Sequence, residues 1–268
     1  MEKNLTKHSP VERVALAREA QRPKIRDYIS ALFEDFFETH GDRLYGDDKS
    51  MLCGIARFGN IPVTVAGNIK AATLAESIEC NFGMANPEGY RKFQRAALQA
   101  EKFKRPIITF IDTPGAYPGV EAEMRGQGEA IARCIFMLSS LRVPIIAVFT
   151  GEGGSGGALA IAVSDRILMM ENAIFSILSP EGFASILWKD SKRRDEACEL
   201  MKLISEDLEH FGIADRIVEE PEGGAPSDPK FVFGKLKLAL EEELSALMSL
   251  NIDELIKQRR KKYRFIGV

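Results

Sequence analysis

Apolar residues recur with a helical period in the N-terminal part of this 268-residue chain. The spacing predicts an amphipathic helix within residues 11–40 that begins near Pro23. The side chains expected on its apolar face are Ile25, Ile29, Leu32, Phe33, Phe36 and Phe37. Glycines and short acidic residues between positions 40 and 48 then end the helical pattern.

Two short apolar segments follow, at residues 52–58 and 62–67. The pair Gly59-Asn60 lies between them and favours a tight turn. We therefore expect the two segments to form a β-hairpin.

From residue 88 onward, helical and strand-like segments alternate. Short apolar strands separated by helices usually pair in parallel, so this region predicts an α/β core. The predicted helices cover residues 88–103, 121–139, 158–164, 180–189 and 194–210, and the predicted strands cover 107–111, 145–149, 167–170 and 174–178.

The C-terminal part predicts a breaker-rich loop at residues 219–229 and an amphipathic helix at 231–262. Residues 257–264 are strongly basic. We interpret this run as a solvated helix end rather than a binding patch, because cations are favoured near helix C-termini.

Composition narrows the class of protein only slightly. Hydrophobic residues make up 45% of the chain and charged residues 28%, as in an ordinary globular protein, and the length suits one large α/β domain. The formal net charge of −3 gives no general attraction to nucleic acid or acidic lipid.

The cysteines show no metal-binding or disulfide spacing. Cys53, Cys80, Cys134 and Cys198 are widely separated, so we expect buried reduced thiols and no metal site. The N-terminus lacks the apolar segment of a signal peptide, and no apolar run is long enough for a membrane span. These features predict a cytoplasmic protein with no membrane partner.

A glycine-rich run at residues 151–157 follows an apolar strand and precedes an apolar helix. Three chemistries use such a turn. Its glycines fit the dinucleotide pattern G-x-G-x-x-G, and Gly153, Ser155 and Gly157 fit the nucleophile pattern G-x-S-x-G. The third possibility is an oxyanion hole, in which backbone amides hold charge on a reacting oxygen.

Each of the first two interpretations lacks support elsewhere in the chain. Glu171 has the spacing of a ribose-binding acid, but the helix between it and the glycines is too short and apolar for a dinucleotide-binding unit. A hydrolase triad would have to use Ser155, Asp195 and His210, and the end of a helix explains His210 without catalysis.

A second turn favours the oxyanion hole. Residues 111–119 also follow an apolar strand and contain a proline-glycine turn. Because the carboxyl ends of parallel strands share one edge of a sheet, the amides of both turns are expected to face one crevice.

Several long strings, in this order, resemble the carboxyltransferase alpha subunits of bacterial acetyl-CoA carboxylase, and the resemblance covers nearly the whole chain. The strings are Asn81-Phe82-Gly83-Met84 and residues 86–92, 111–119, 125–133, 151–160 and 179–189.

The resemblance implies a crotonase/ClpP-like α/β fold, built as a spiral of β-β-α turns. It implies an N-terminal helical extension at residues 1–45, a carboxyltransferase core at 46–230 and a C-terminal helical extension at 231–268. It also implies transfer of a carboxyl group from carboxybiotin to acetyl-CoA, which gives malonyl-CoA for fatty acid synthesis.

The resemblance further implies several partners. A zinc-ribbon beta subunit would complete an α2β2 transferase, and a separate biotin carboxyl carrier protein and a biotin carboxylase would join the larger complex. The chain has no Ala-Met-Lys-Met string, so it is expected to use carboxybiotin on the carrier without carrying biotin itself.

By the same resemblance, backbone amides are the catalytic groups, and no protein base is required. They would hold the ureido oxygen of biotin when carbon dioxide leaves, and the biotin would then take the methyl proton of the thioester. The expected amide donors are Gly115, Ala116, Gly156 and Gly157, and the expected biotin-binding residues are Tyr117, Gly153, Gly154 and Ser155.

The chain departs from the family pattern at three positions. Ala71 replaces a glycine, Met124 a glutamate and Pro226 a histidine. These changes bear on coenzyme A contacts, and we interpret Lys70 as a solvent-exposed lysine rather than a phosphate ligand. A stand-alone acyl-CoA hydratase or hydrolase remains an alternative function, as does a scaffold that has lost its site, although the intact glycine turns argue against the scaffold.

Overall fold

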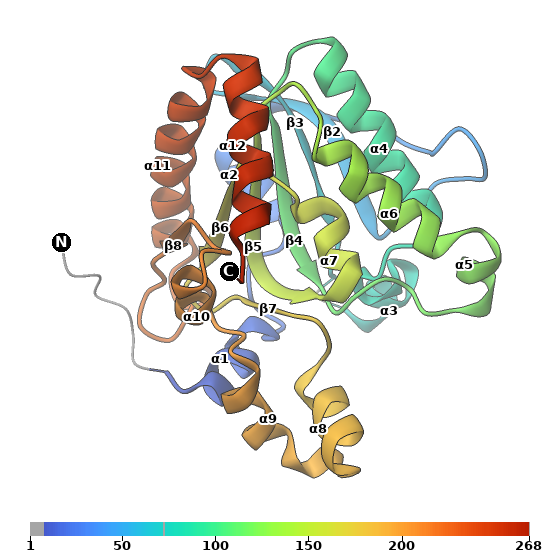
Figure 1. Cartoon of the computed structure of the whole chain (residues 1–268), viewed down its shortest axis with the longest axis vertical. Coiled ribbons are helices and arrows are strands. Elements are labelled where there is room, and N and C mark those ends of the chain that lie inside the picture. The colour runs from blue at the N-terminus through green and yellow to red at the C-terminus, as the bar shows by residue number, and fades with distance from the viewer. Residues whose placement is uncertain (1–7, 72, 268) are drawn as a thin grey trace.

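A mixed β-sheet organises the chain in the computed structural model, which describes residues 8–71 and 73–267 (Figure 1). The strands of the described part are β1 (Glu34–Glu38), β2 (Met51–Phe58), β3 (Ile61–Asn68), β4 (Ile107–Thr113), β5 (Ile145–Gly154), β6 (Arg166–Met170), β7 (Ile174–Ser176) and β8 (Arg216–Val218). Their order in the sheet is β1-β2-β3-β4-β5-β6-β8, and β7 pairs with the end of β5. The β1–β2 and β2–β3 pairs are antiparallel, and all later pairs are parallel.

Helices cover both faces of this sheet (Figure 1). They are α1 (Pro10–Ala17), α2 (Ile25–Leu32), α3 (Leu74–Glu79), α4 (Pro87–Lys102), α5 (Val120–Met124), α6 (Gln127–Leu138), α7 (Ser155–Ala162), α8 (Pro180–Trp188), α9 (Arg194–Met201), α10 (Ser205–His210), α11 (Pro229–Met248) and α12 (Ile252–Phe265). None of the helices in the described residues is both long and apolar enough to cross a membrane.

Side chains of β4 alternate between the two helical layers, as the period of a strand requires. Thr109 donates a 2.8 Å hydrogen bond to the Ile161 carbonyl of α7 on one face. Phe110 stacks on Tyr28 of α2 on the other face, with 5.5 Å between ring centroids. Both faces are therefore covered, which explains why the strand segments at 107–111 and 145–149 are almost entirely apolar.

The predicted hairpin and the predicted parallel core are both confirmed. The N-terminal helix is wrong in its second half, because α2 ends at Leu32 and Phe36 and Phe37 lie in β1. Pairing with β2 overrides the helical period there: the Phe36 ring packs over Gly54, where any Cβ would collide with it. The short helix α1, which has a capping box formed by Ser9 and Glu12, was not predicted.

Three predicted long helices are each two helices. The segment 121–139 breaks at Gly126, whose φ is +83°, and 194–210 breaks at Lys202, whose φ is +52°. The segment 231–262 breaks before Asn251, whose side chain accepts the Glu254 N–H at 2.9 Å and so caps α12. Strand β8 was also missed, because it is only three residues long.

The glycine run is mostly strand rather than turn. Residues 151–154 continue β5, because they pair with β7 along the register Glu152↔Ile174 to Gly154↔Ser176. The change of direction comes at Ser155, where α7 begins. The predicted division into a core and two extensions stays a prediction.

Candidate active site

Two turns touch at the carboxyl ends of β4 and β5. Thr113 at the end of β4 is in register with Gly153 near the end of β5. A Cβ on Gly154 would collide with the Pro114 carbonyl, and one on Gly157 would collide with the Ala116 amide. Glycine at these two positions therefore lets the backbones of the two turns pack directly on each other.

Gly115 is required for a different reason. Its φ is +151°, which L side chains rarely adopt, although the nearest atom to a Cβ there would be the Gly154 carbonyl oxygen at 3.9 Å. The turn between β4 and α5 therefore depends on the backbone freedom of this residue.

The first turn of α7 presents free amides. Ser155, Gly156 and Gly157 are its first three residues, and N–H groups at such positions have no acceptor within the helix. Gly154, at the N-cap, supplies no side-chain bond to them. Gly156 is partly exposed, and the nearest atom to a Cβ on it would be a methyl of Ile131 at 3.7 Å. Among the described residues, the positive end of α7 is thus a place where a ligand oxygen could accept from N–H groups, with room beside Gly156.

The four predicted amide donors differ in their surroundings. The Gly115 N–H donates to Thr113 Oγ1 at 3.1 Å, within its own turn. Within the described part of the chain, the Ala116 N–H has no hydrogen-bond acceptor, and Ala116 is partly exposed. Gly157 is buried, whereas Gly156 is not. Ala116 and Gly156 are thus the partly exposed members of the set, although the Ala116 nitrogen packs against Gly157.

The four predicted biotin-binding residues also divide in two. Gly153 and Gly154 are buried in β5 and pair with β7, so they shape the turn. Ser155 is exposed, and Tyr117 is half-buried beside the other turn. The Tyr117 N–H donates to the Ala85 carbonyl at 3.0 Å.

Buried side chains that received no role from the sequence hold the turns in place. Gln127 Nε2 donates 2.9 Å bonds to both the Ala85 and Tyr117 carbonyls. Tyr90 Oη donates to the Gly157 carbonyl at 3.4 Å. Gln127 lies inside one of the strings that carry the family resemblance, but only the structure shows what it touches.

An apolar groove of 580 Å³ adjoins the first turn of α7. Gly156 and Ser155 form one end of it, and Ile177 and Phe211 are exposed along its walls. The other lining residues are Leu159, Phe175, Ser176, Met201, Lys202, Leu208 and Ile213. A ligand with an apolar body and a negative or polar oxygen fits a groove of this kind.

Ser155 has the backbone of a nucleophile elbow but no base. Its φ is +53°, a strained value for a serine at a strand-to-helix turn. His210 is exposed at the end of α10, and its ring lies against Phe211, with 5.6 Å between ring centroids. No histidine of the described residues is hydrogen-bonded to Ser155. The hydrolase interpretation therefore gains nothing from the structure.

The dinucleotide interpretation is wrong about Glu171. This carboxylate is fully buried, accepts the Glu220 N–H at 2.9 Å and lies 3.8 Å from the Arg13 guanidinium. It is committed to the protein and cannot reach a ribose.

Lys70 is also not the solvent-exposed lysine that the sequence suggested. It is half-buried, and its Nζ donates to Asp112 Oδ1 at 3.0 Å. Lys24 lies 3.9 Å from the other oxygen of Asp112, and burial lowers the pKa of Lys24 by more than that carboxylate raises it. Asp112 therefore anchors two lysines at the end of β4. Ala72, beside Ala71, lies outside the described residues.

Two arginines near the N-terminus bind acids at the carboxyl edge of the sheet. Arg18 joins Glu152 of β5, with a shortest N–O distance of 2.6 Å, to Glu181 of α8 at 3.0 Å. Arg22 is fully buried and donates to Glu220 and to the Thr150 carbonyl. These interactions hold the N-terminal segment beside the end of β5, next to the glycine turn.

The cysteines are buried and unpaired, as predicted. Burial raises the pKa of Cys53 and of Cys134 to about 12, which keeps both thiols protonated. Among residues 8–71 and 73–267, no cluster of three or more His, Cys, Asp or Glu side chains could hold a metal ion. Besides amides and apolar walls, the groove offers a ligand the polar side chains of Ser155, Ser176 and Lys202.

Solved structures share this architecture. The transcarboxylase 12S hexamer superposes with a TM-score of 0.68 at 18% identity, over 91% of this chain and 47% of that chain. A Pseudomonas malonate decarboxylase hetero-tetramer gives a TM-score of 0.65 at 17% identity, over 80% of this chain and 86% of that chain. The fold is thus that of the crotonase-type carboxyltransferases, as predicted.

Sequence comparison identifies the family within that class. The family described as "Acetyl co-enzyme A carboxylase carboxyltransferase-like" matches residues 1–267. The chain belongs to the family of acetyl-CoA carboxylase carboxyltransferase alpha subunits.

Curated relatives bear the same name. The chain is 54% identical to the acetyl-coenzyme A carboxylase carboxyl transferase subunit alpha of Clostridium botulinum, over 99% of this chain and 97% of the relative. It is 53% identical to the alpha subunit of Carboxydothermus hydrogenoformans, over 98% of this chain and 81% of the relative. It is also 53% identical to a beta/alpha protein of Clostridium tetani, over 95% of this chain and 44% of that protein.

Proposed function

We infer that this chain is the alpha half of a carboxyltransferase that moves a carboxyl group from carboxybiotin, held on a separate carrier protein, to acetyl-CoA, forming malonyl-CoA. The observation that carries the proposal is the contact between the two turns at the ends of β4 and β5, where Ala116 and Gly156 are partly exposed and Gly156 lines the apolar groove. Membership of the alpha-subunit family supplies the reaction.

The described residues offer what a biotin head group needs. The 580 Å³ groove has apolar walls, and the start of α7 has amide donors at one end of it. Carboxybiotin supplies the transferable carboxyl group when it is bound. The protein's part is to orient the ring against the groove and to donate N–H groups to the ureido oxygen as negative charge develops there.

Backbone amides suit this role because they are fixed before the reaction. The ends of β4 and β5 hold the two turns, and Gln127 and Tyr90 bind carbonyls of these turns. Donors held in this way need no reorganisation when the charge appears. Backbone amides also do not titrate, so the part of the reaction assigned to this chain needs no histidine or cysteine.

The second half of the site belongs to a beta subunit in this proposal. A relative in which beta and alpha are one protein supports close association of the two. Exposed apolar side chains, among them Ile177 of the groove and also Ile186 and Val120, provide a surface for such a partner. An α2β2 assembly, a zinc ribbon on beta, the carrier and a biotin carboxylase in the larger complex complete the proposal. A cytoplasmic location stays a prediction.

The reverse reaction tests the function. The chain, purified with its beta partner, is expected to transfer the carboxyl group of malonyl-CoA to free biotin and to release acetyl-CoA. Loss of malonyl-CoA that required no biotin, or hydrolysis of other acyl-CoA thioesters, would instead support the stand-alone hydratase or hydrolase.

A further inference from the structure

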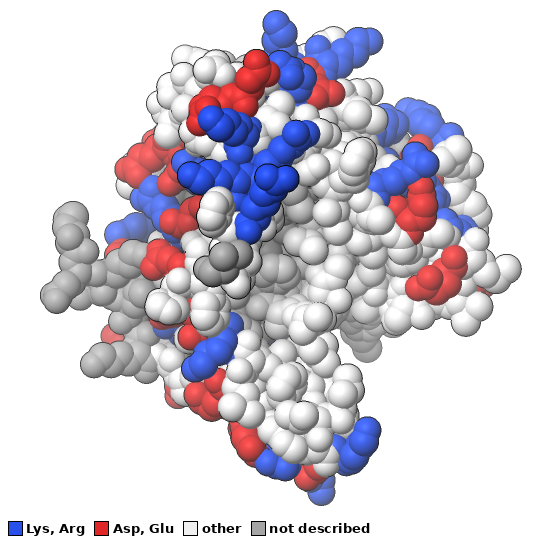
Figure 2. Space-filling view, viewed as in Figure 1, with Lys and Arg blue, Asp and Glu red and all other residues white. Residues whose placement is uncertain are grey.

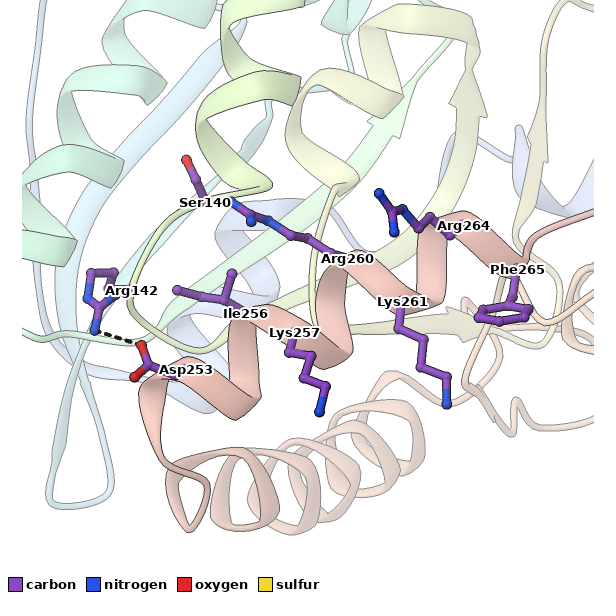
Figure 3. Close-up of a pocket in the computed structure, with 9 residues that line it drawn as sticks. All are labelled: Ser140, Arg142, Asp253, Ile256, Lys257, Arg260, Lys261, Arg264 and Phe265. Carbon is purple, nitrogen blue, oxygen red and sulfur yellow. Dashed lines mark hydrogen bonds and ion pairs between the residues drawn. The ribbon is translucent and has the colours of Figure 1, made fainter.

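A basic groove of 690 Å³ runs along α12, away from the two turns. We use the name "basic groove" for the surface lined by Ser140, Arg142, Asp253, Ile256, Lys257, Arg260, Lys261, Arg264 and Phe265 (Figure 3). Five of these residues are cationic and one is acidic. Figure 2 shows the corresponding cluster of basic side chains on the face that carries α12.

Most of the positive charge in the basic groove is not neutralised. Asp253 pairs with Arg142 at 3.2 Å, and Lys257 has Glu254 only at 3.8 Å. Within the described residues, Arg260 and Arg264 have no ion pair, and Figure 3 shows Arg260 extending toward Ser140 without meeting a carboxylate. Exposed like charges at this spacing repel one another, so a bound anion would stabilise them.

The basic side chains are not what attaches α12 to the protein. Arg259 anchors the helix instead, because it is buried, pairs with Asp165 at 2.7 Å and donates 2.8 Å bonds to the Leu138, Leu141 and Val143 carbonyls. The basic residues that line the groove lie on the outer side of the helix or beside it and are exposed. Their charge is therefore available for a partner.

The basic groove is connected to the candidate active site through α7. Tyr263 of α12 accepts the Ser164 N–H at 2.8 Å, just beyond the last residue of α7. The other end of α7 begins with Ser155 and Gly156. The 8 residues of this helix span about 12 Å, so the place where α12 contacts the end of α7 lies roughly one short helix away from the amide turn.

We propose that the basic groove is the docking surface for an acidic face of the carrier protein that delivers carboxybiotin. The inference rests on the proposed function, because it requires a carrier that visits this chain. Charge complementarity would bring the carrier to α12, and the short distance along α7 would let its flexible biotinyl arm reach the apolar groove beside Gly156.

The length of the basic cluster favours a compact acidic protein surface over a nucleic acid. Figure 2 shows acidic side chains directly bordering the basic cluster, which limits its length. A nucleic-acid backbone would need a longer unbroken track of cations.

A double charge reversal tests the proposal in the assembled transferase. Arg260→Glu with Lys261→Glu changes only exposed side chains of the groove. With the biotinylated carrier protein as acceptor in the reverse reaction, we expect KM for the carrier to rise about tenfold or more at low salt, with kcat unchanged. With free biotin as acceptor, kcat and KM should equal those of the unmodified complex.

The matched control reverses two charges elsewhere, with Lys230→Glu and Lys237→Glu on α11, which are exposed and do not line the groove. This control should keep KM for the carrier within about twofold of the unmodified complex. It changes the net charge as much as the groove variant does, but it leaves the basic groove intact. An unchanged KM for the carrier in the groove variant would overturn the proposal. So would binding of a labelled RNA oligonucleotide, at about 150 mM salt, that the groove variant abolishes. Failure of the unmodified complex to carboxylate free biotin would instead contradict the proposed function.

Discussion

At the scale of single residues, neighbouring glycines in one turn have different roles. Gly157 lets the two turns pack against each other, because a Cβ at this position would collide with the amide of Ala116. Gly156 is partly exposed and lies at the start of α7, so its lack of a side chain leaves the helix end uncovered. A Cβ at this position would not collide with the protein. Of these two glycines, only Gly156 therefore allows a substitution that separates catalysis from packing.

Gly156→Val is expected to lower kcat of the reverse reaction about 100-fold, the usual cost of losing one oxyanion donor. The valine would cover the amide end of α7, while the room beside Ile131 leaves the fold intact. The matched control is Gly128→Val, which also changes the second residue of a helix in open space. In steady-state kinetics, kcat of that control should stay within about threefold of the unmodified enzyme, because nothing beyond its own helix lies within 4 Å of the new side chain's Cβ. Equal losses in the two variants would remove the amide assignment.

Ser155→Ala is expected to retain most of the turnover, because the amide of residue 155 survives the substitution and no base activates the hydroxyl. Single-turnover and steady-state rates with free biotin measure this directly. A loss as large as that of the Gly156 variant would restore the nucleophile hypothesis for Ser155.

At the scale of elements, the N-terminal segment is tied to the active edge of the sheet by buried charge. Arg22 and Glu220 are both almost completely buried. Burial raises the pKa of the Glu220 carboxyl, but the Arg22 charge and hydrogen bonds from Asn172 outweigh burial and hold that pKa below its usual value. The carboxylate thus stays charged and holds the N-terminal segment beside β5.

Arg22→Met is expected to lower the free energy of unfolding by about 3–5 kcal/mol, because Glu220 would keep its burial and lose its partner. Urea denaturation measures the change. The double variant Arg22→Met/Glu220→Leu should recover only part of the loss, because the unpaired carboxylate is gone but N–H donors of Asn172 and Ala225 lose their acceptor. Arg57→Met, which removes exposed pairs with Glu34 and Asp35, is the control and should leave the midpoint within error. An unchanged midpoint in Arg22→Met would show that the pair does not hold the segment.

Much of the secondary structure could be predicted from the sequence, and the failures have physical causes. Buried parallel strands such as β4 are recognisable from local composition alone. Strand β1 is not, because its pairing with β2 overrides a helical spacing of aromatic residues. The breaks at Gly126 and Lys202 come from single left-handed residues, which the spacing of apolar side chains does not reveal.

The candidate site could likewise be predicted only in part. The glycine turns and their adjacency follow from strand order, which the alternating pattern predicts. Two hydrogen bonds could not be predicted, because they depend on where side chains lie in the folded protein. In one the Gly115 N–H donates to Thr113, and in the other Gln127 donates to the Tyr117 carbonyl. The resemblance to a family supplied the reaction, and the geometry shows which residues of the two turns are buried and which are partly exposed.

At the scale of the whole molecule, the proposed function gives this chain half of an active site. One edge of the sheet carries the amide crevice and the apolar groove, and exposed apolar side chains lie near them. Helix α12 presents a separate basic surface (Figure 2). This arrangement suits a subunit that meets the carboxyl acceptor on one partner and the carboxyl donor on another.

The dependence of activity on the beta partner is the sharpest test of this division of the active site between two subunits. The rate of malonyl-CoA-dependent carboxylation of free biotin would be measured at fixed alpha while beta is added from none to excess. We expect no activity from alpha alone and a rate that rises and levels off when the two subunits are equal in number. Carboxylation of biotin by the alpha chain without beta would show instead that this chain holds a complete site.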